Sequence, residues 1–248
     1  MKLAAIYNVW DGVELLRHSM DCLKGHVDVY IIVWQPFSNW GEQHNPLEDI
    51  KKAIEGYEIP NELVVFSEYV PEKLCGMYNE ILKRNQGLEV AKKLNCTHFL
   101  HIDADEMYTD FGAAKQQYID SGAEGSVCKL YTYFKQPTWR FDTEDGYYVP
   151  FIHQLHPHTK AAREYPFYAD PTRGVNCTHV VELPTHMHHM SWVRKDIERK
   201  ARNSSAKSNI ERGTMLQDYH NPNLAPGFYV RDYDKRLIEV PNYFNIFL

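Results

Sequence analysis

The first 110 residues alternate between short apolar runs and stretches that have the 3.6-residue spacing of an amphipathic helix. The apolar runs cover residues 2–9, 28–34, 63–66 and 97–102. Strands that alternate with helices are joined by right-handed crossovers into a parallel sheet. The sequence therefore predicts an α/β fold, in which a Rossmann-like, mostly parallel sheet is flanked by helices.

The helices between these strands have recognisable signals. Asp11 and Glu14 form a capping-box pattern before a helix that continues to Leu23. Two further helices are expected over residues 50–57 and 72–94. In a parallel sheet, ligands bind at the carboxyl ends of the strands. The polar residues that follow each apolar run are therefore candidates for a binding site.

After residue 110 the pattern becomes less regular. Strands are expected over residues 127–134 and 147–155, and residues 156–190 are expected to be mostly irregular. A helix over 193–208 then begins a C-terminal helical and irregular extension. We therefore divide the chain into two regions. Residues 1–190 form a region that binds the ligand and the molecule that accepts the transferred group, and residues 191–248 form an extension that packs on the same domain.

Asp103 and Asp105 directly follow the strand expected over residues 97–102. In extended backbone, residues i and i+2 point to the same side, so we expect the two carboxylates to converge. Oxygen ligands favour Mg²⁺ or Mn²⁺, and such an ion stabilises the charge that develops on a leaving diphosphate. A solvated turn after the strand is the simpler structural interpretation of the same residues.

Two segments resemble a known group of enzymes. LKRNQGLEVAKKLNCTHFLHIDADEMY and AAIYNVWDGVELLRHSMDCL are similar to glycosyltransferases of the GT-A fold, close to family 2 and of the stand-alone bacterial or phage type. The resemblance covers roughly residues 2–110 and implies a nucleotide-sugar donor, most often a UDP-sugar. It implies that Tyr7, Asn8 and Gln35 line the nucleoside pocket. Further roles that it implies are contact of Arg84 with the nucleotide, and contacts of Asp103 and Asp105 with the ribose and the metal.

A histidine-rich segment, residues 186–192, offers a further metal ligand. Neutral imidazole binds divalent metals, and His188 or His189 is our candidate. The basic residues that follow, Lys200 among them, resemble a run in some family 2 members and could bind the diphosphate. Core histidines beside a solvated helix face are the alternative. A zinc hydrolase built on the histidines is disfavoured, because HExxH and nearby cysteines are absent.

An inverting transferase needs a carboxylate that takes the proton of the acceptor hydroxyl. Asp170 lies in a proline-bounded loop and is our first candidate, and Glu182, which precedes the histidines, is the second. A retaining enzyme would need no such base. The sequence leaves this choice open.

Composition limits the setting. The formal net charge of −6 gives no support for a DNA partner, although a hydroxymethylated DNA base stays among the possible hydroxyl acceptors with a glycan, a lipid-linked sugar or a protein. The start of the sequence has no secretory pattern, and no stretch approaches the ~20 apolar residues of a membrane span. With five cysteines and no CxxC, we expect a cytoplasmic protein of a bacterium or a phage-infected host.

Two other functions share these features. A nucleotidyltransferase has a similar sheet and metal, but it usually carries a glycine-rich loop after the first strand, where this chain reads NVWDGVELL. A non-catalytic nucleotide- or sugar-binding module would keep the fold and bind the donor without cleaving it. Turnover distinguishes the three.

Overall fold

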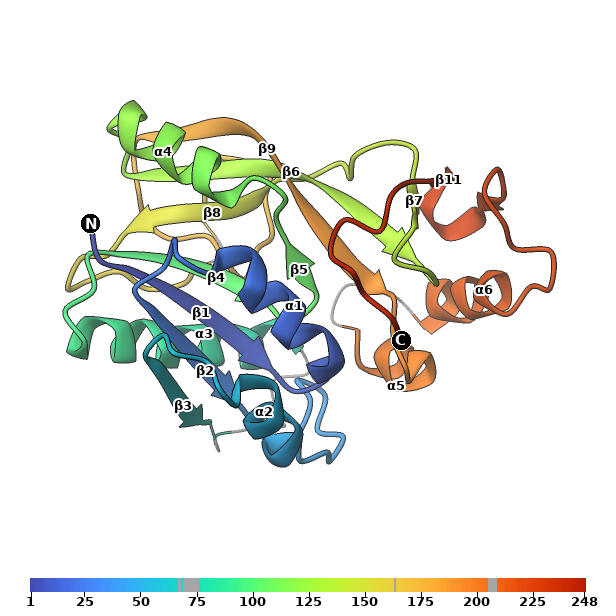
Figure 1. Cartoon of the computed structure of the whole chain (residues 1–248), viewed down its shortest axis with the longest axis horizontal. Coiled ribbons are helices and arrows are strands. Elements are labelled where there is room, and N and C mark those ends of the chain that lie inside the picture. The colour runs from blue at the N-terminus through green and yellow to red at the C-terminus, as the bar shows by residue number, and fades with distance from the viewer. Residues whose placement is uncertain (67, 69–75, 163, 205–208) are drawn as a thin grey trace.

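In the computed structural model, which describes residues 1–248 except 67, 69–75, 163 and 205–208, the chain folds around one eleven-stranded mixed sheet (Figure 1). Four strands of the first half are parallel neighbours in the order β4-β1-β2-β3. They are β1 (Leu3–Val9), β2 (Val29–Trp34), β3 (Asn61–Val65) and β4 (His98–Asp103). The predicted α/β class with a largely parallel sheet is confirmed.

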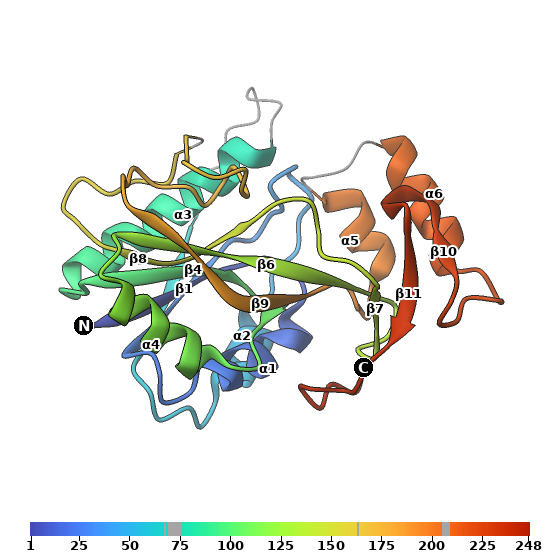
Figure 2. The ribbon, with the colours of Figure 1, turned by 90° about the horizontal axis from the view of Figure 1, so that it is seen from above.

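Helices cover both faces of this parallel part (Figure 2). One face packs on α1 (Val13–Leu23), α2 (Leu47–Ile54) and α4 (Phe111–Ser121), and the other packs on α3 (Gly76–Lys93). Because side chains alternate along a strand, Tyr7 faces the α1 side and Ile6 faces α3. A glycine in α3, Gly87, permits close approach, since a Cβ there would lie 2.3 Å from Ile6 Cγ2.

The second half extends the sheet beyond β4. Its strands are β5 (Glu106–Met107), β6 (Gly125–Phe134), β7 (Trp139–Phe141), β8 (Val149–Gln154) and β9 (Val180–Trp192). β8 lies between β4 and β6 and is antiparallel to both, so that β6 runs in the same direction as β4. β9 is parallel to β6 and antiparallel to β5. The carboxyl ends of β4, β6 and β9 therefore lie at one end of the sheet.

The C-terminal elements lie beyond β7 at the right of Figure 1. They are α5 (Ile197–Asn203), α6 (Asn209–Tyr219), β10 (Tyr229–Val230), a 3₁₀ turn (Arg231–Tyr233) and β11 (Lys235–Glu239). β11 pairs antiparallel with β7, and Trp192, Met215 and Leu237 join a separate apolar cluster there. The division at residue 190 stays a prediction; it falls two residues before the end of β9.

Three local predictions are wrong. Gly12, with φ 74°, takes the N-cap position of α1 in place of Asp11 and has no side chain to cap it. The carboxylate of Glu14 accepts from Lys195 N. Residues 180–190 are not irregular but form most of β9. Pro184 hid this strand, since proline cannot donate to a sheet, and it is accommodated where the β6 register shifts between Glu182 and His186.

The helix expected over 193–208 starts later, at Ile197, because Asp196 provides the cap by accepting from Arg199 N. Helix α4 was not predicted at all. The expected helix residues 72–75 and 205–208 lie outside the described part. Among the helices that the structure describes, none has the length and apolar character needed to cross a bilayer.

Candidate active site

Asp103 ends β4 and pairs in register with Asn8 on β1. It lies on the α3 face of the sheet, where two buried arginines reach its carboxylate. Arg84 Nη2 from α3 lies 3.3 Å from Oδ1, and Arg173 Nη2 lies 2.8 Å from Oδ2. Burial raises the pKa of Asp103, but the two guanidinium groups outweigh it and hold the pKa below its usual value. Asp103 is therefore an anion in the structure.

Arg173 is the centre of this ion-pair cluster. Its guanidinium donates to both oxygens of Glu106, over 2.5 and 2.6 Å, as well as to Asp103 and to the carbonyl of His101. Its Nε lies 3.0 Å from Asp170 Oδ2. Glu106 is 1 % exposed, and burial raises its pKa although Arg173 opposes the effect. One arginine thus joins the strand end to the loop that carries Asp170.

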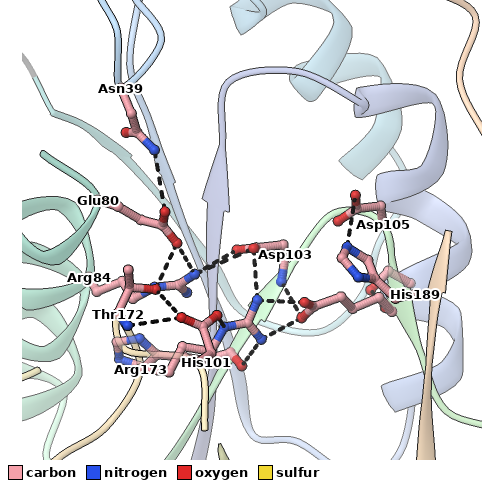
Figure 3. Close-up of polar contacts among 12 residues, drawn as sticks. Asn39, Glu80, Arg84, His101, Asp103, Asp105, Thr172, Arg173 and His189 are labelled. Atoms are coloured by element: carbon pink, nitrogen blue, oxygen red, sulfur yellow. Dashed lines mark hydrogen bonds and ion pairs between the residues drawn. The ribbon is translucent and has the colours of Figure 1, made fainter. Parts of the chain in front are cut away.

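The same cluster continues to α3 (Figure 3). Arg84 donates to Glu80, one turn earlier, at 2.5 Å, and its Nε donates to Thr172 Oγ1 at 3.2 Å. The Thr172 hydroxyl lies 2.9 Å from Glu80 Oε1 and 2.8 Å from Asp170 Oδ1. Asn39 Nδ2 reaches Glu80 at 3.5 Å. Helix, strand end and loop are therefore linked by charged hydrogen bonds, which are stronger than neutral ones.

Asp105 belongs to a different set of contacts. Figure 3 shows it apart from Asp103 and next to His189, whose Nε2 lies 3.5 Å from Asp105 Oδ2. The same oxygen accepts from the guanidinium of Arg194 and lies 3.3 Å from Lys200 Nζ. Burial raises the pKa of Asp105, but Arg194 and then Lys200 lower it far below its usual value. The two aspartates therefore occupy separate ion-pair clusters.

The residues Asp105, Glu106 and His189 could hold a metal, since one ligand atom of each lies within 4.8 Å of the others. Their oxygen and nitrogen atoms are of the kind that Mn²⁺ or Mg²⁺ accepts. However, Arg194 and Lys200 already neutralise Asp105, and Arg173 occupies both oxygens of Glu106. The donor types suit a divalent ion, but the charges around them do not fit one.

His188 points away from this group, because neighbouring side chains on a strand alternate. It is buried beneath Tyr133, whose hydroxyl lies 2.8 Å from His188 Nδ1. Burial lowers the pKa of His188 to about 4, so that the ring is neutral at pH 7. Of the two predicted histidines, the structure brings only His189 to Asp105.

The residues predicted for the nucleoside pocket do not all lie on the same face of the sheet. Tyr7 is fully buried in the core, 3.0 Å from Ser19 Oγ, and lies on the α1 side. Asn8 lies at the carboxyl end of β1, where neither atom of its amide has a hydrogen-bond partner in the described part of the chain. Gln35 Nε2 donates to Phe37 O, and its Oε1 is unpaired among the described residues. Asn8 and Gln35 are thus the two with atoms free to bind.

Unpaired buried polar atoms gather at this end of the sheet. Besides Asn8 and Gln35, they include Trp10 Nε1, Asn39 Oδ1 and Arg84 Nη1, again considering only the residues described. A cavity of about 360 Å³ lies in the loop that follows β2, and none of these residues lines it. It is lined by Pro36, Phe37, Gln43, His44 and Asn45. Because buried polar groups are nearly always paired in native proteins, these atoms indicate a polar ligand.

The two candidate bases both contact Tyr148, Asp170 through its backbone N–H and Glu182 through its carboxylate. Asp170 belongs to the Arg173 cluster and its side chain is 22 % exposed. Glu182 lies near the start of β9 and accepts from the Tyr148 hydroxyl at 2.9 Å. At a rise of ~3.3 Å per residue, the seven residues from Glu182 to His189 span about 23 Å. The structure therefore does not bring Glu182 to Asp105.

The sequence analysis did not select Glu80, Glu106 or Arg173. A signal for Glu80 existed, since Glu80 and Arg84 have the i,i+4 spacing of a helical ion pair. Glu106 directly follows Asp105 and could have been included with it. Nothing local marks Arg173, whose partners are up to 72 residues away.

Sequence comparisons find no matching family model and no matching curated protein. Solved structures do match, at low identity. The crystal structure of S. aureus TarS 1-349 matches at 10 % sequence identity with a TM-score of 0.45. The crystal structure of the same protein in complex with UDP matches at 12 % identity with a TM-score of 0.47. Both matches cover 89 % of this chain, with 72 % and 71 % of TarS 1-349. Mannose-1-phosphate geranyltransferase from Thermus thermophilus matches at 16 % and 0.33, covering 63 % of this chain and 51 % of that one.

Proposed function

We propose that this chain is a glycosyltransferase that moves a sugar from a nucleotide-sugar, with a UDP-sugar as the first candidate, to a hydroxyl acceptor. The observation that carries the proposal is the set of unpaired polar atoms at the carboxyl ends of β1 and β2, where Arg84 pairs with Asp103, the register partner of Asn8. Lys200, which pairs with Asp105, is a second cation of the candidate site. A nucleoside has groups that pair with amides, and a diphosphate needs cations. The resemblance to GT-A enzymes of family 2, of stand-alone bacterial or phage type, points the same way.

Each residue then has a role in binding the donor. Asn8 and Gln35 bind the nucleoside through their free amide atoms, and Arg84 lies beside them with Nη1 unpaired among the described residues. Lys200 binds the diphosphate. Asp103 accepts from the ribose hydroxyls, and its contacts with two arginines support this role by fixing its carboxylate. A carboxylate fixed in this way is preorganised, which is how most polar sites gain specificity.

In the transfer step, the acceptor oxygen attacks the anomeric carbon while the bond from that carbon to the diphosphate oxygen breaks. The nucleoside diphosphate leaves with the electron pair, and in an inverting reaction a carboxylate takes the acceptor proton. Asp170 is our proposed base, since it lies in the Arg173 cluster. Glu182 stays the second candidate, although its distance along β9 disfavours it.

The acceptor class and the cellular setting stay predictions. A glycan, a lipid-linked sugar, a protein or a hydroxymethylated DNA base each offers the required hydroxyl, and the net charge of −6 favours an acceptor other than DNA. A cytoplasmic location is proposed from the sequence. The proposal of sugar transfer does not depend on the predicted Mn²⁺ or Mg²⁺. Whether the site binds that ion depends on the ion pairs around Asp105.

A panel of UDP-, GDP- and dTDP-sugars tests the proposal, with release of nucleoside diphosphate as the readout and Asn8→Ala as the variant. Donor cleavage that Asn8→Ala weakens is the expected result. Binding of every donor without any cleavage would instead identify a non-catalytic binding module. Formation of nucleotide-sugar from a sugar 1-phosphate and a nucleoside triphosphate would identify a nucleotidyltransferase.

A further inference from the structure

The carboxylate of Asp105 is already saturated by protein cations. Arg194 and Lys200 both approach Oδ2, and His189 lies at 3.5 Å from it. The Asp105 side chain is 5 % exposed, so that these contacts are poorly screened by water. A metal at this oxygen would have to replace a guanidinium or an ammonium group, or lie next to both.

Arg194 has little room to move away. Its side chain is 4 % exposed, and it also donates to the carbonyls of Met190 and Val193. It packs directly on Gly12, where a Cβ would lie 2.9 Å from its Cζ. Arg194 is therefore confined next to Asp105. Its positive charge repels any divalent ion that approaches the same carboxylate.

Carboxylates and cations are close in number within the two clusters. Five carboxylates lie in the two clusters, namely Glu80, Asp103, Asp105, Glu106 and Asp170. Five cationic side chains lie beside them, namely Lys83, Arg84, Arg173, Arg194 and Lys200. A divalent ion would add two charges to this set. An incoming diphosphate would instead supply negative charge to a cation that can turn towards it.

Lys200 is suited to be that cation. It lies on α5, its side chain is 22 % exposed, and it is long and flexible where Arg194 is confined. An ammonium group has three donors, so one can stay on Asp105 while another reaches a phosphate oxygen. We infer that this site binds a nucleoside diphosphate without a divalent ion, and that Lys200 supplies the positive charge. Asp105 holds Lys200 in position, while Arg194 stays fixed on the same carboxylate. The inference rests on the proposed function.

Calorimetric titration with UDP, in EDTA and then in Mn²⁺, tests the inference without requiring turnover. We expect UDP to bind in EDTA, with a Kd that Mn²⁺ changes by less than threefold. Loss of a hydrogen bond to a charged group predicts a Kd that is weaker by ~10- to 100-fold in Lys200→Met. Lys200→Arg keeps the charge and should retain most of the affinity. Lys195→Met, an exposed lysine of the preceding loop, is the matched control and should bind as the wild type does.

Coupling between Asp105 and Lys200 tests the positioning role. If Asp105 acts by holding Lys200, Asp105→Asn weakens UDP binding in the wild type but has no further effect in Lys200→Met. A purely structural role would give the same loss in both backgrounds and would refute the positioning part.

The failures can be told apart. UDP binding that is lost in EDTA and restored by Mn²⁺, or that is unchanged in Lys200→Met, overturns the inference and leaves the proposed function standing. Absence of binding by UDP, GDP and dTDP in both EDTA and Mn²⁺ overturns the proposed function as well.

Discussion

Replacing Arg173 by methionine removes the one side chain that joins three carboxylates of the site. Its guanidinium occupies both oxygens of Glu106 and one oxygen each of Asp103 and Asp170. Asp103 keeps Arg84 as a partner, whereas Glu106 keeps only its contact with the backbone N–H of Asp103 among the contacts that the structure describes. Glu106, at 1 % exposed, therefore bears most of the cost.

The cost follows from leaving a buried charge uncompensated. Removing one partner of a buried ion pair destabilises a protein by about 3–5 kcal/mol. For a chain of this size, one kcal/mol corresponds to ~2–4 °C in Tm, so the variant should melt roughly 6–20 °C below the wild type. A typical domain has only ~5–15 kcal/mol of stability, which makes this a large share of it.

Urea unfolding of Arg173→Met and of the double variant Arg173→Met/Glu106→Gln provides the assay. The second change removes the stranded charge, so the double variant should regain about 1–3 kcal/mol. Without Arg173, burial raises the pKa of Glu106 further above its unfolded value of ~4.3, and the folded state then holds the proton. The deficit against the wild type should be small below pH 4 and should grow as pH rises towards 7. A deficit below 1 kcal/mol at pH 7, or a double variant no more stable than the single one, would refute this reasoning.

Three other predictions concern packing, catalysis and pH. Gly87→Ala should destabilise by about 1–3 kcal/mol in urea unfolding, because its Cβ overlaps Ile6, although alanine favours helix; no loss would contradict the close approach. Asp170→Asn should lower turnover by ~10²-fold or more if it is the base, while Glu182→Gln leaves turnover unchanged; the reverse result would exchange their roles. Burial lowers the pKa of His188 to about 4, so the free energy of unfolding should fall as pH drops from ~6.5 towards 4. In His188→Gln the urea midpoint should fall less over this pH range. An equally steep fall in the variant would refute the role of His188.

The sequence was informative about the fold where its signals are local. The apolar runs that became β1, β2 and β4 are buried along nearly their whole length, and such strands have little alternative to a sheet covered on both faces. Helix α4 was missed although Phe111, Ala114 and Tyr118 form its buried stripe, because a stripe of three positions in eleven residues is a weak periodic signal.

The site was less predictable, because its contacts are long-range. The spacing of Asp103 and Asp105 predicts two carboxylates on one side of extended backbone, but β4 ends at Asp103 and Asp105 lies in the turn that follows. Their partners Arg173 and Arg194 come 70 and 89 residues later. No local pattern specifies which arginine a carboxylate will meet, since Arg173 precedes β9, Arg194 follows it, and both are far along the chain from β4.

The ion pairs at Arg173 and Arg194 also limit how the chain can be redesigned. Both arginines come from the second half of the sequence, and both neutralise acids of the first half. A chimera that grafts a foreign second half onto residues 1–110 would strand Glu106 and Asp105 unless both guanidinium groups were carried across. For protein engineering, the two halves therefore have to be exchanged or kept together.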